Sequence, residues 1–425
     1  YRTQSLRPHG PSDRRTGIHR QVGHVLLDEP AFDADRSSPT PTKIFDAVHH
    51  LKLGAEAMED TQAEREQLAV LSLRAGERAN AWLAYASASA YFALGLDMLQ
   101  QIYGGGVFAS PQEPERPHYK LALALYGAAL EAAGLECDLG AKAATDTPSP
   151  LERMDQLSEI VFEHARTLLD KVKVCEAQIR VYAAHNQWTE VMEVGRRALA
   201  WLGVTLPAAP SASEVDQASQ ETRMALVDVI GGVVETLDPQ GIEDLIRLSP
   251  MTAPHQLRAM GILSELSTAA RFVACPNANR LLTLVVCEQI KLLLKWGNTS
   301  FENETSASHH VLSMAAYAYA NYGCILCEQT GDIEAGYQFG RLALDLLNRV
   351  AAESPRTADR WRPRVLFLVN ALIKHWKVDA RETLRPLLEA YRRSLEMGDL
   401  AYAAWAIFFY NQAAFFTSSE LSDIE

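Results

Sequence analysis

The sequence is short of the features that mark several large classes of protein. No run reaches the roughly 18 uncharged apolar residues of a membrane-spanning helix, and the start has no signal-peptide pattern. The 6 cysteines are scattered, which fits a reducing compartment better than a disulfide framework. Lysine and arginine (40) are fewer than aspartate and glutamate (53), and a net charge of −13 repels a nucleic-acid backbone. These absences predict a cytoplasmic protein that binds neither membranes nor nucleic acid.

Motifs that would carry catalysis or hold a cofactor are also missing. A triple glycine is present, but the Gly-Lys-Ser/Thr of a phosphate-binding loop does not follow it. His164 lacks the acidic neighbour and the spacing of a phosphoacceptor histidine. Cys324 and Cys327, with His309 and His310 upstream, have the outline of a zinc site, but two cysteines inside a helix of small residues are more typical of apolar packing. We therefore predict no catalytic residue, no cofactor and no metal ion.

What the sequence does have is helical periodicity. Hydrophobic residues make up 48% of the chain and recur at three-and-four spacing, whereas no alternating strand pattern bounded by turns appears. A chain of 425 residues is too long for one ordinary core, yet no long Pro- or Ser-rich linker splits it. An array of antiparallel helical hairpins, a tetratricopeptide-like α-solenoid, satisfies both facts. We predict an all-α fold of this kind.

The clearest hairpin lies on either side of Gly331. This glycine is expected to end the first helix with a positive φ, and Asp332 to cap the second. The bulky residue usual at one position of the tetratricopeptide pattern is Gly340 here. We expect one face of the first helix to be buried, comprising Met314, Tyr317, Ala318, Asn321, Tyr322, Ile325 and Leu326.

Three segments are predicted along the chain. Residues 1–42 form an irregular entry segment with one short helix, which starts near Ile18. Residues 43–206 form a first helical sub-array and residues 207–425 a second, because Pro207 opens the clearest internal break. Aromatic residues at helix spacing are expected to be core: Trp82, Tyr85 and Phe92 on a helix from Asn80 to Gln101, and Trp405, Phe408 and Phe409.

One part of this acidic chain is basic. Nine lysines and arginines lie between Arg360 and Arg393, and we predict that they place a basic face on the surface. A local reversal of sign attracts an oppositely charged partner, although a solvated helix surface gives the same pattern. The candidate interaction residues are Arg381, Arg385, Arg392 and Arg393.

Several helical segments carry a family resemblance. IHRQVGHVLLDE, IFDAVHHLKLGAE, LSLRAGERANAWLAYASASAYFALGLDML and HARTLLDKVKVCEAQIRVYAAHNQ occur in the first half, and LIRLSPMTAPHQLRAMGILSELSTAARFVAC and RVLFLVNALIKHWKVDARETLRPLLEAYRRSLEMGDLAYAAWA in the second. From about Ile18 to Tyr410 the chain resembles the helical region of very large signalling proteins. Those proteins carry a serine/threonine-kinase-like head, a STAND P-loop ATPase, this helical region, a GAF domain and a hybrid histidine kinase.

The resemblance implies a context more than an activity. The ATPase and kinase motifs of such proteins lie outside the similar region, so no functional residue transfers to this chain. It implies a non-catalytic scaffold or sensor arm that contacts neighbouring domains of the parent protein or a protein partner. The alternative is the ligand-sensing helical arm of an ATPase-linked transcription regulator. The oligomeric state is not indicated by these patterns.

Overall fold

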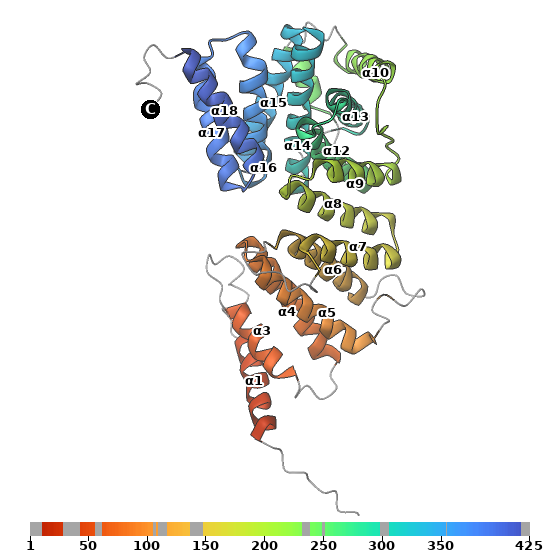
Figure 1. Ribbon diagram of the computed structural model, residues 1–425, viewed down its shortest axis with the longest axis vertical. Helices are drawn as coiled ribbons and strands as arrows, with labels where there is room; N and C mark the ends of the chain where they lie inside the picture. The colour runs from red at the N-terminus through yellow and green to blue at the C-terminus, as the bar shows by residue number, and fades with distance from the viewer. Residues whose placement is uncertain are drawn as a thin grey trace, which may run out of the picture. The chain divides into compact units, whose positions relative to one another are not determined.

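The computed structural model is helical throughout its regular structure. It describes residues 11–28, 43–55, 62–104, 108, 117–136, 148–231, 239–248, 251–297, 306–353 and 355–417. Within these ranges no strand is present and successive helices pack as pairs, which confirms the all-α helical-repeat prediction (Figure 1). No described helix combines the length and hydropathy that crossing a membrane requires. The chain divides into two compact units, Tyr1–His185 and Asn186–Glu425.

The first unit contains seven described helices. They are α1 (Pro11–Asp28), α3 (Lys43–Leu53), α4 (Gln62–Ala81), α5 (Tyr85–Tyr103), α6 (Pro117–Leu135), α7 (Pro150–His164) and α8 (Leu168–Ala184). Neighbours in sequence are neighbours in space, since α1 packs on α3, α4 on α5, and α6 on α5 and α7.

Two expectations for this unit need correction. The first helix begins at Pro11 instead of near Ile18, because proline suits the first turn of a helix. The helix expected from Asn80 is interrupted, and α5 starts only at Tyr85. The interruption is a turn in which Leu83 has a φ of 59°, so Trp82 lies in the turn and is exposed instead of belonging to the core.

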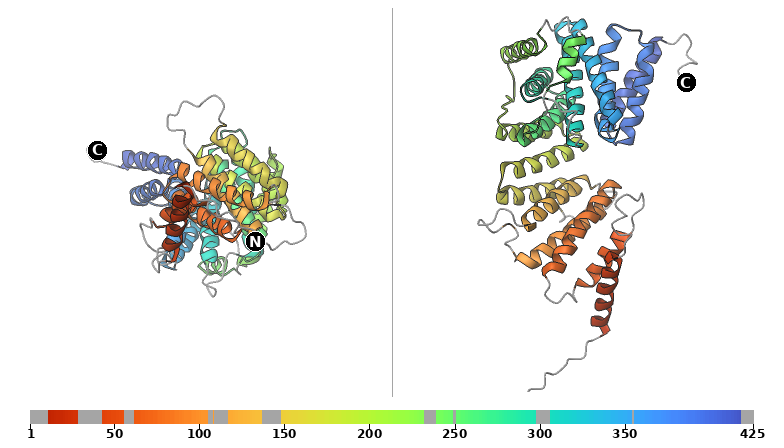
Figure 2. Two further views of the ribbon diagram at one scale, coloured as in Figure 1. Left: turned by 90° about the horizontal axis from the view of Figure 1, so that it is seen from below. Right: turned by 180° about the vertical axis from the view of Figure 1, so that it is seen from behind.

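The second unit contains the remaining helices. They are α9 (Trp188–Trp201), α10 (Ala212–Ile230), α11 (Pro239–Ile246), α12 (Pro254–Phe272), α13 (Ala278–Trp296), α14 (Ser306–Ile325), η5 (Leu326–Thr330), α15 (Ile333–Glu353), α16 (Pro355–Phe367), η6 (Leu368–Ile373), η7 (Lys374–Trp376), α17 (Arg381–Glu396) and α18 (Leu400–Thr417). The boundary expected at residue 207 lies inside this unit, because α9 packs against α12. Figure 2 shows α17 and α18 in dark blue at the edge of the unit.

The hairpin of α14 and α15 forms the centre of this unit. Gly331 has a φ of 71°, and the Asp332 side chain accepts a hydrogen bond from the Ala335 amide at 3.1 Å, as predicted. Close packing explains the glycines, since a Cβ at Gly336 would lie 2.7 Å from the Gly323 carbonyl oxygen. The expectation of one buried face was too narrow. Every residue from Val311 to Cys327 is buried, because helices surround α14 on several sides.

Two segments of π-helix interrupt the regular helices of this unit. η5 continues α14 to the Gly331 turn, and η6 continues α16. A π-helical turn widens the backbone spiral and frequently occurs at functional sites. Both segments contribute residues to the pocket described below.

Candidate functional site

A buried polar cluster around Arg364 joins four helices of the second unit. The Arg364 guanidinium donates to Asp399 at 2.9 Å, to Glu265 at 3.4 Å and to the Thr268 hydroxyl at 3.2 Å. The hydroxyls of Thr268, Tyr317 and Tyr402 continue this network, with oxygens 2.9 and 2.7 Å apart. The cluster connects α16 with α12, α14 and α18, and thereby positions the last hairpin.

The charges in this cluster stabilise one another. Burial by itself would raise the pKa of Glu265, but Arg364 and Arg360 lower it below its ordinary value. Burial opposes the charge of Arg364, whereas Glu265 and Asp399 raise its pKa. A buried charge with partners on several helices favours one arrangement of those helices. We therefore assign the cluster a structural role.

The two cysteines of the central hairpin are surrounded by apolar packing. Cys324 is fully buried, and burial raises the pKa of its thiol to about 12. Burial likewise raises the pKa of Cys327 to about 11. Among the described residues, no group of three or more histidine, cysteine, aspartate or glutamate side chains is placed to hold a metal ion. The side chains of His309 and His310 lie outside the described residues.

The basic run does not form one exposed face, contrary to our prediction. Its first part belongs to α16, where Arg364 is half-buried between Glu265 and Asp399. Arg360 pairs with Glu265 at 3.0 Å and Arg362 with Glu389 at 3.0 Å. These arginines pair with acidic groups of the same unit, and Lys377 of η7 pairs with Glu334.

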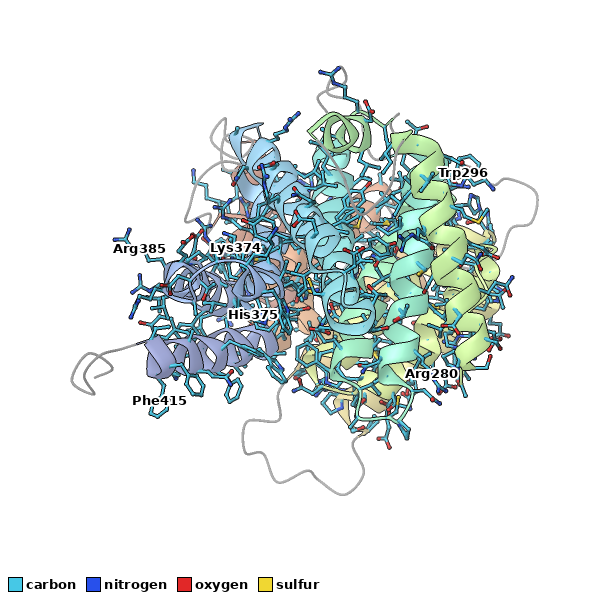
Figure 3. The ribbon with its side chains drawn as sticks, turned by 90° about the horizontal axis from the view of Figure 1, so that it is seen from above. Arg280, Trp296, Lys374, His375, Arg385 and Phe415 are labelled. Atoms are coloured by element: carbon cyan, nitrogen blue, oxygen red, sulfur yellow. The ribbon has the colours of Figure 1, made fainter. Side chains whose placement is uncertain are left out.

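The four candidate residues on α17 have different environments. Arg381 is exposed and donates to the Thr417 carbonyl at 2.9 Å, which ties the start of α17 to the end of α18. Arg385 and Arg392 are exposed, and Figure 3 shows Arg385 projecting outward. Arg393 is half-buried and pairs with Glu389 at 2.9 Å. Arg385 and Arg392 are therefore the residues best placed to contact a partner.

The aromatic residues of α18 differ from our prediction. Trp405 and Phe408 were expected in the core, but 42% and 56% of their surface is exposed. Phe415 and Phe416 are exposed to 60% and 75%, and Figure 3 shows Phe415 projecting from the hairpin. α18 has no charged residue, so its sequence alone would suggest a fully buried helix. Only one face packs on other described helices, and its buried residues are Tyr402, Ala403, Ala406 and Ala414. The outer face of α18 is thus apolar and open.

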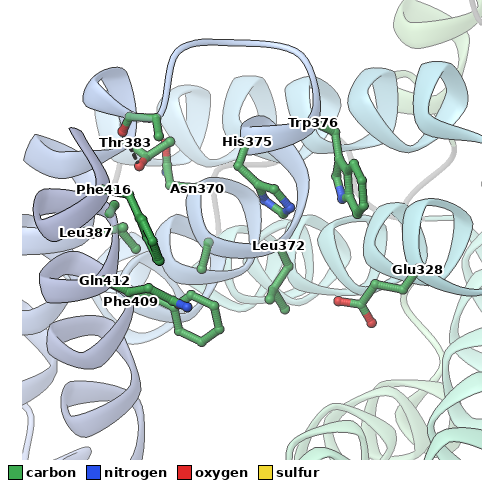
Figure 4. Close-up of a pocket in the computed structure, with 13 residues that line it drawn as sticks. Glu328, Asn370, Leu372, His375, Trp376, Thr383, Leu387, Phe409, Gln412 and Phe416 are labelled. Atoms are coloured by element: carbon green, nitrogen blue, oxygen red, sulfur yellow. Dashed lines mark hydrogen bonds between the residues drawn. The ribbon is translucent and has the colours of Figure 1, made fainter.

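A pocket of about 430 Å³ lies beside the inner edge of this hairpin. Figure 4 shows Phe409 and Phe416 of α18 on one side, with His375, Trp376 and Glu328 on the other. Sites for small ligands usually have volumes of about 300 to 1,000 Å³ and mainly apolar walls with a few polar groups. The lining comprises Glu328, Asn370, Ala371, Leu372, His375, Trp376, Ala380, Thr383, Leu387, Phe409, Gln412, Ala413 and Phe416.

The polar groups of the pocket are mostly hydrogen-bond acceptors or already paired. Partial burial lowers the pKa of His375, so its imidazole is neutral at pH 7. The Thr383 hydroxyl donates to the Ala380 carbonyl at 2.7 Å. Asn370 donates to the Leu366 carbonyl at 2.8 Å, while its buried Oδ1 accepts no hydrogen bond from the described residues. Desolvation raises the pKa of Glu328, the one charged residue of the lining.

Sequence reasoning did not find this pocket. Glu328 lies in η5, Asn370 in η6 and Trp376 in η7, and the pocket brings them together with residues of α17 and α18. The uncharged, aromatic-rich run of α18 was the signal that sequence could have supplied. No protein-family model matches the chain, and no curated protein is significantly similar to it.

Proposed function

We propose that the chain is a non-catalytic helical-repeat arm of a multidomain signal-transduction ATPase or kinase. It docks onto a neighbouring domain of the parent protein, or onto a protein partner, through the outer surface of α17 and α18. The observation that carries this proposal is the bare outer face of α18, where Phe408 and Phe415 are exposed on a helix without charges. Exposed apolar patches of this kind mark association surfaces.

The charges of α17 indicate what kind of surface would fit. Arg381, Arg385 and Arg392 are spaced i, i+4 and i+11, so they share one face of the helix. The opposite face of α17 is buried, with Thr383 and Leu387 inward. An acidic surface with apolar residues beside it would match both the guanidinium groups and the aromatic rings.

A salt-dependent binding measurement tests the proposal. The chain is titrated with the separately expressed neighbouring domains of the parent protein at low and high salt. Reversing charge at Arg385 and Arg392 is expected to weaken association and to reduce its dependence on salt. Arg393 is unsuitable for this test because its reversal would also break the pair with Glu389. Unaltered association after the double reversal would contradict the docking surface.

A second measurement tests the non-catalytic half of the proposal. The purified chain is expected neither to hydrolyse ATP nor to phosphorylate itself, since it lacks a phosphate-binding loop and a kinase catalytic motif. Labelled phosphate incorporated at His164 would contradict this. In the structure, His164 ends α7 and its ring stacks on Phe108 with centroids 5.1 Å apart.

The alternative function, a ligand-sensing arm, is favoured by a different observation. The pocket between η6, α17 and α18 has the volume and the apolar walls of a small-molecule site. A sensor and a docking arm are compatible, because the pocket and the outer face of α18 occupy different sides of the same hairpin.

A further inference from the structure

The chemistry of the pocket restricts what it can hold. Its lining contains one carboxylate, Glu328, and no lysine or arginine. Phosphorylated and carboxylated metabolites usually need a cationic group to replace their hydration, and no lysine or arginine lines this pocket, where the Asn370 amide nitrogen already donates to the Leu366 carbonyl. The imidazole of His375 is neutral, so it adds no positive charge to the lining. Anionic ligands are therefore disfavoured.

The aromatic rings of the pocket favour a cation. Trp376, Phe409 and Phe416 line it from two sides, and Trp376 and Glu328 lie on the same side in Figure 4. Ring faces attract ammonium groups, and sets of aromatic residues around a cavity recognise such groups in many proteins. No lysine, arginine or histidine of the described residues forms a salt bridge with Glu328, and although burial raises its pKa, the nearby Arg271 lowers it and favours the ionised form.

The hydrogen-bonding groups of the pocket wall favour a ligand that carries a hydrogen-bond donor. Glu328 can only accept when it is ionised, and the buried Oδ1 of Asn370 has no donor among the described residues. An unsatisfied buried acceptor costs about 1 to 3 kcal/mol, so a ligand that supplies a donor gains affinity there. Acceptors combined with aromatic rings match the chemistry of an amine.

We propose that this pocket binds a small amine with an aromatic or branched aliphatic body. The body lies between Phe409 and Phe416 on one side and Trp376 on the other, and the ammonium group faces Glu328. The proposal does not depend on the docking surface, because it concerns the inner edge of the hairpin and not the outer face of α18.

Three probes with the same phenyl body test the choice of head group. Phenethylamine, 2-phenylethanol and 3-phenylpropionate carry a cation, a neutral hydroxyl and an anion, respectively. Each is titrated into the full chain by isothermal calorimetry or ligand-observed NMR. We expect the amine to bind about tenfold more tightly than the carboxylate. Equal affinity for both, or no binding of the amine at millimolar concentration, would overturn the proposal.

Surface variants locate the site, with a matched control on the same helix. Glu328→Gln is expected to abolish the preference for the amine over the alcohol. Phe416→Ala and Trp376→Ala are each expected to weaken amine binding about fivefold, because each removes one aromatic wall. Phe415→Ala is the control, since Phe415 is exposed on the same helix but does not line the pocket. An effect of Phe415→Ala equal to that of Phe416→Ala would refute the location.

Separate readouts keep this proposal apart from the docking function. All four variants change exposed residues, so circular dichroism and thermal unfolding should match the parent chain. Light scattering with and without phenethylamine reports on self-association. If the pocket is instead covered by a second copy of the chain, dimerisation would depend on Phe416 and the amine preference would be absent, which would contradict the proposal. Loss of docking after reversal at Arg385 and Arg392 would leave amine binding unchanged.

Discussion

The hairpins α14–α15 and α17–α18 are built alike but surrounded differently. Each is a pair of antiparallel helices in which one helix, α14 or α18, is rich in alanine and aromatic residues. The first is enclosed by α12, α13 and α16, and the tyrosines of α14 are buried, whereas the second lies at the edge of the second unit and leaves one face open. Apolar composition therefore does not by itself make a helix part of the core. The number of neighbouring helices decides how many of its faces are covered.

The sharpest test of this contrast removes one phenyl ring from each hairpin. Phe339 of α15 is fully buried and lies against Tyr319 and Tyr322, with ring centroids 5.9 and 5.0 Å apart. Phe339→Ala is expected to destabilise the fold by about 3 to 5 kcal/mol, while Phe415→Ala should change it by less than about 0.5 kcal/mol. Chemical unfolding curves measure both. Similar losses for the two variants would show that the α18 face is covered in solution.

The next largest effect is expected where the edge hairpin is attached to the rest of the unit. Arg364→Leu should cost about 3 kcal/mol, because it leaves Asp399 partly buried without its partner. Arg385→Leu, on the exposed face of α17, serves as the control and should cost almost nothing. Calorimetric unfolding measures the difference.

The pKa shift in the same cluster predicts a pH dependence. The pKa of Glu265 is lower in the folded state, so its contribution to stability is present at neutral pH and is lost as the pH falls through the folded pKa. Loss of stability on acidification should therefore be smaller in Arg364→Leu than in the parent chain. If the free energy of unfolding falls equally on acidification in the variant and the parent chain, the role given to the Arg364–Glu265 pair is contradicted.

A glycine of the central hairpin and a glycine of α12 are expected to respond to alanine in opposite directions. A Cβ at Gly336 would meet Cys327 Sγ at 2.4 Å as well as the Gly323 carbonyl, so Gly336→Ala should destabilise by about 1 to 3 kcal/mol. Gly261 in α12 has no atom within 4 Å of its ideal Cβ. Gly261→Ala should therefore stabilise the fold by about 0.4 to 1 kcal/mol. Denaturant midpoints of the two variants should move in opposite directions.

The turn of the central hairpin provides an effect of similar size. Gly331→Val is expected to cost about 1 kcal/mol or more, because valine at a φ of 71° is strained even where space is free. Cys324→Ala should lower the free energy of unfolding only slightly, because it leaves only a small packing defect. A chelator should leave the unfolding midpoint unchanged. If chelation unfolds the protein as readily as Gly331→Val does, the cysteines bind a metal ion and the packing interpretation is wrong.

The candidate site was only partly predictable. Arg381, Arg385 and Arg392 were identified from charge alone and are exposed on one helix, because a charged residue opposite a buried apolar face must point to solvent. Arg364 belonged to the same run, yet only 16% of its side chain is exposed, since it pairs with Glu265 and Asp399 from other parts of the unit. No local pattern shows which arginine of a run has such partners.

Local physical chemistry, read from the sequence by itself, determined the helices, the Gly331 turn and its Asp332 cap. These features depend on residues within one or two turns of one another, which is why periodicity and capping rules find them. Only the tertiary structure decided which apolar faces stay open, where α14 and α16 widen into π-helix, and that Glu328, Trp376 and Phe416 share a pocket. Those outcomes depend on contacts between segments far apart in the chain, and the spacing of residues within a segment carries no information about its neighbours.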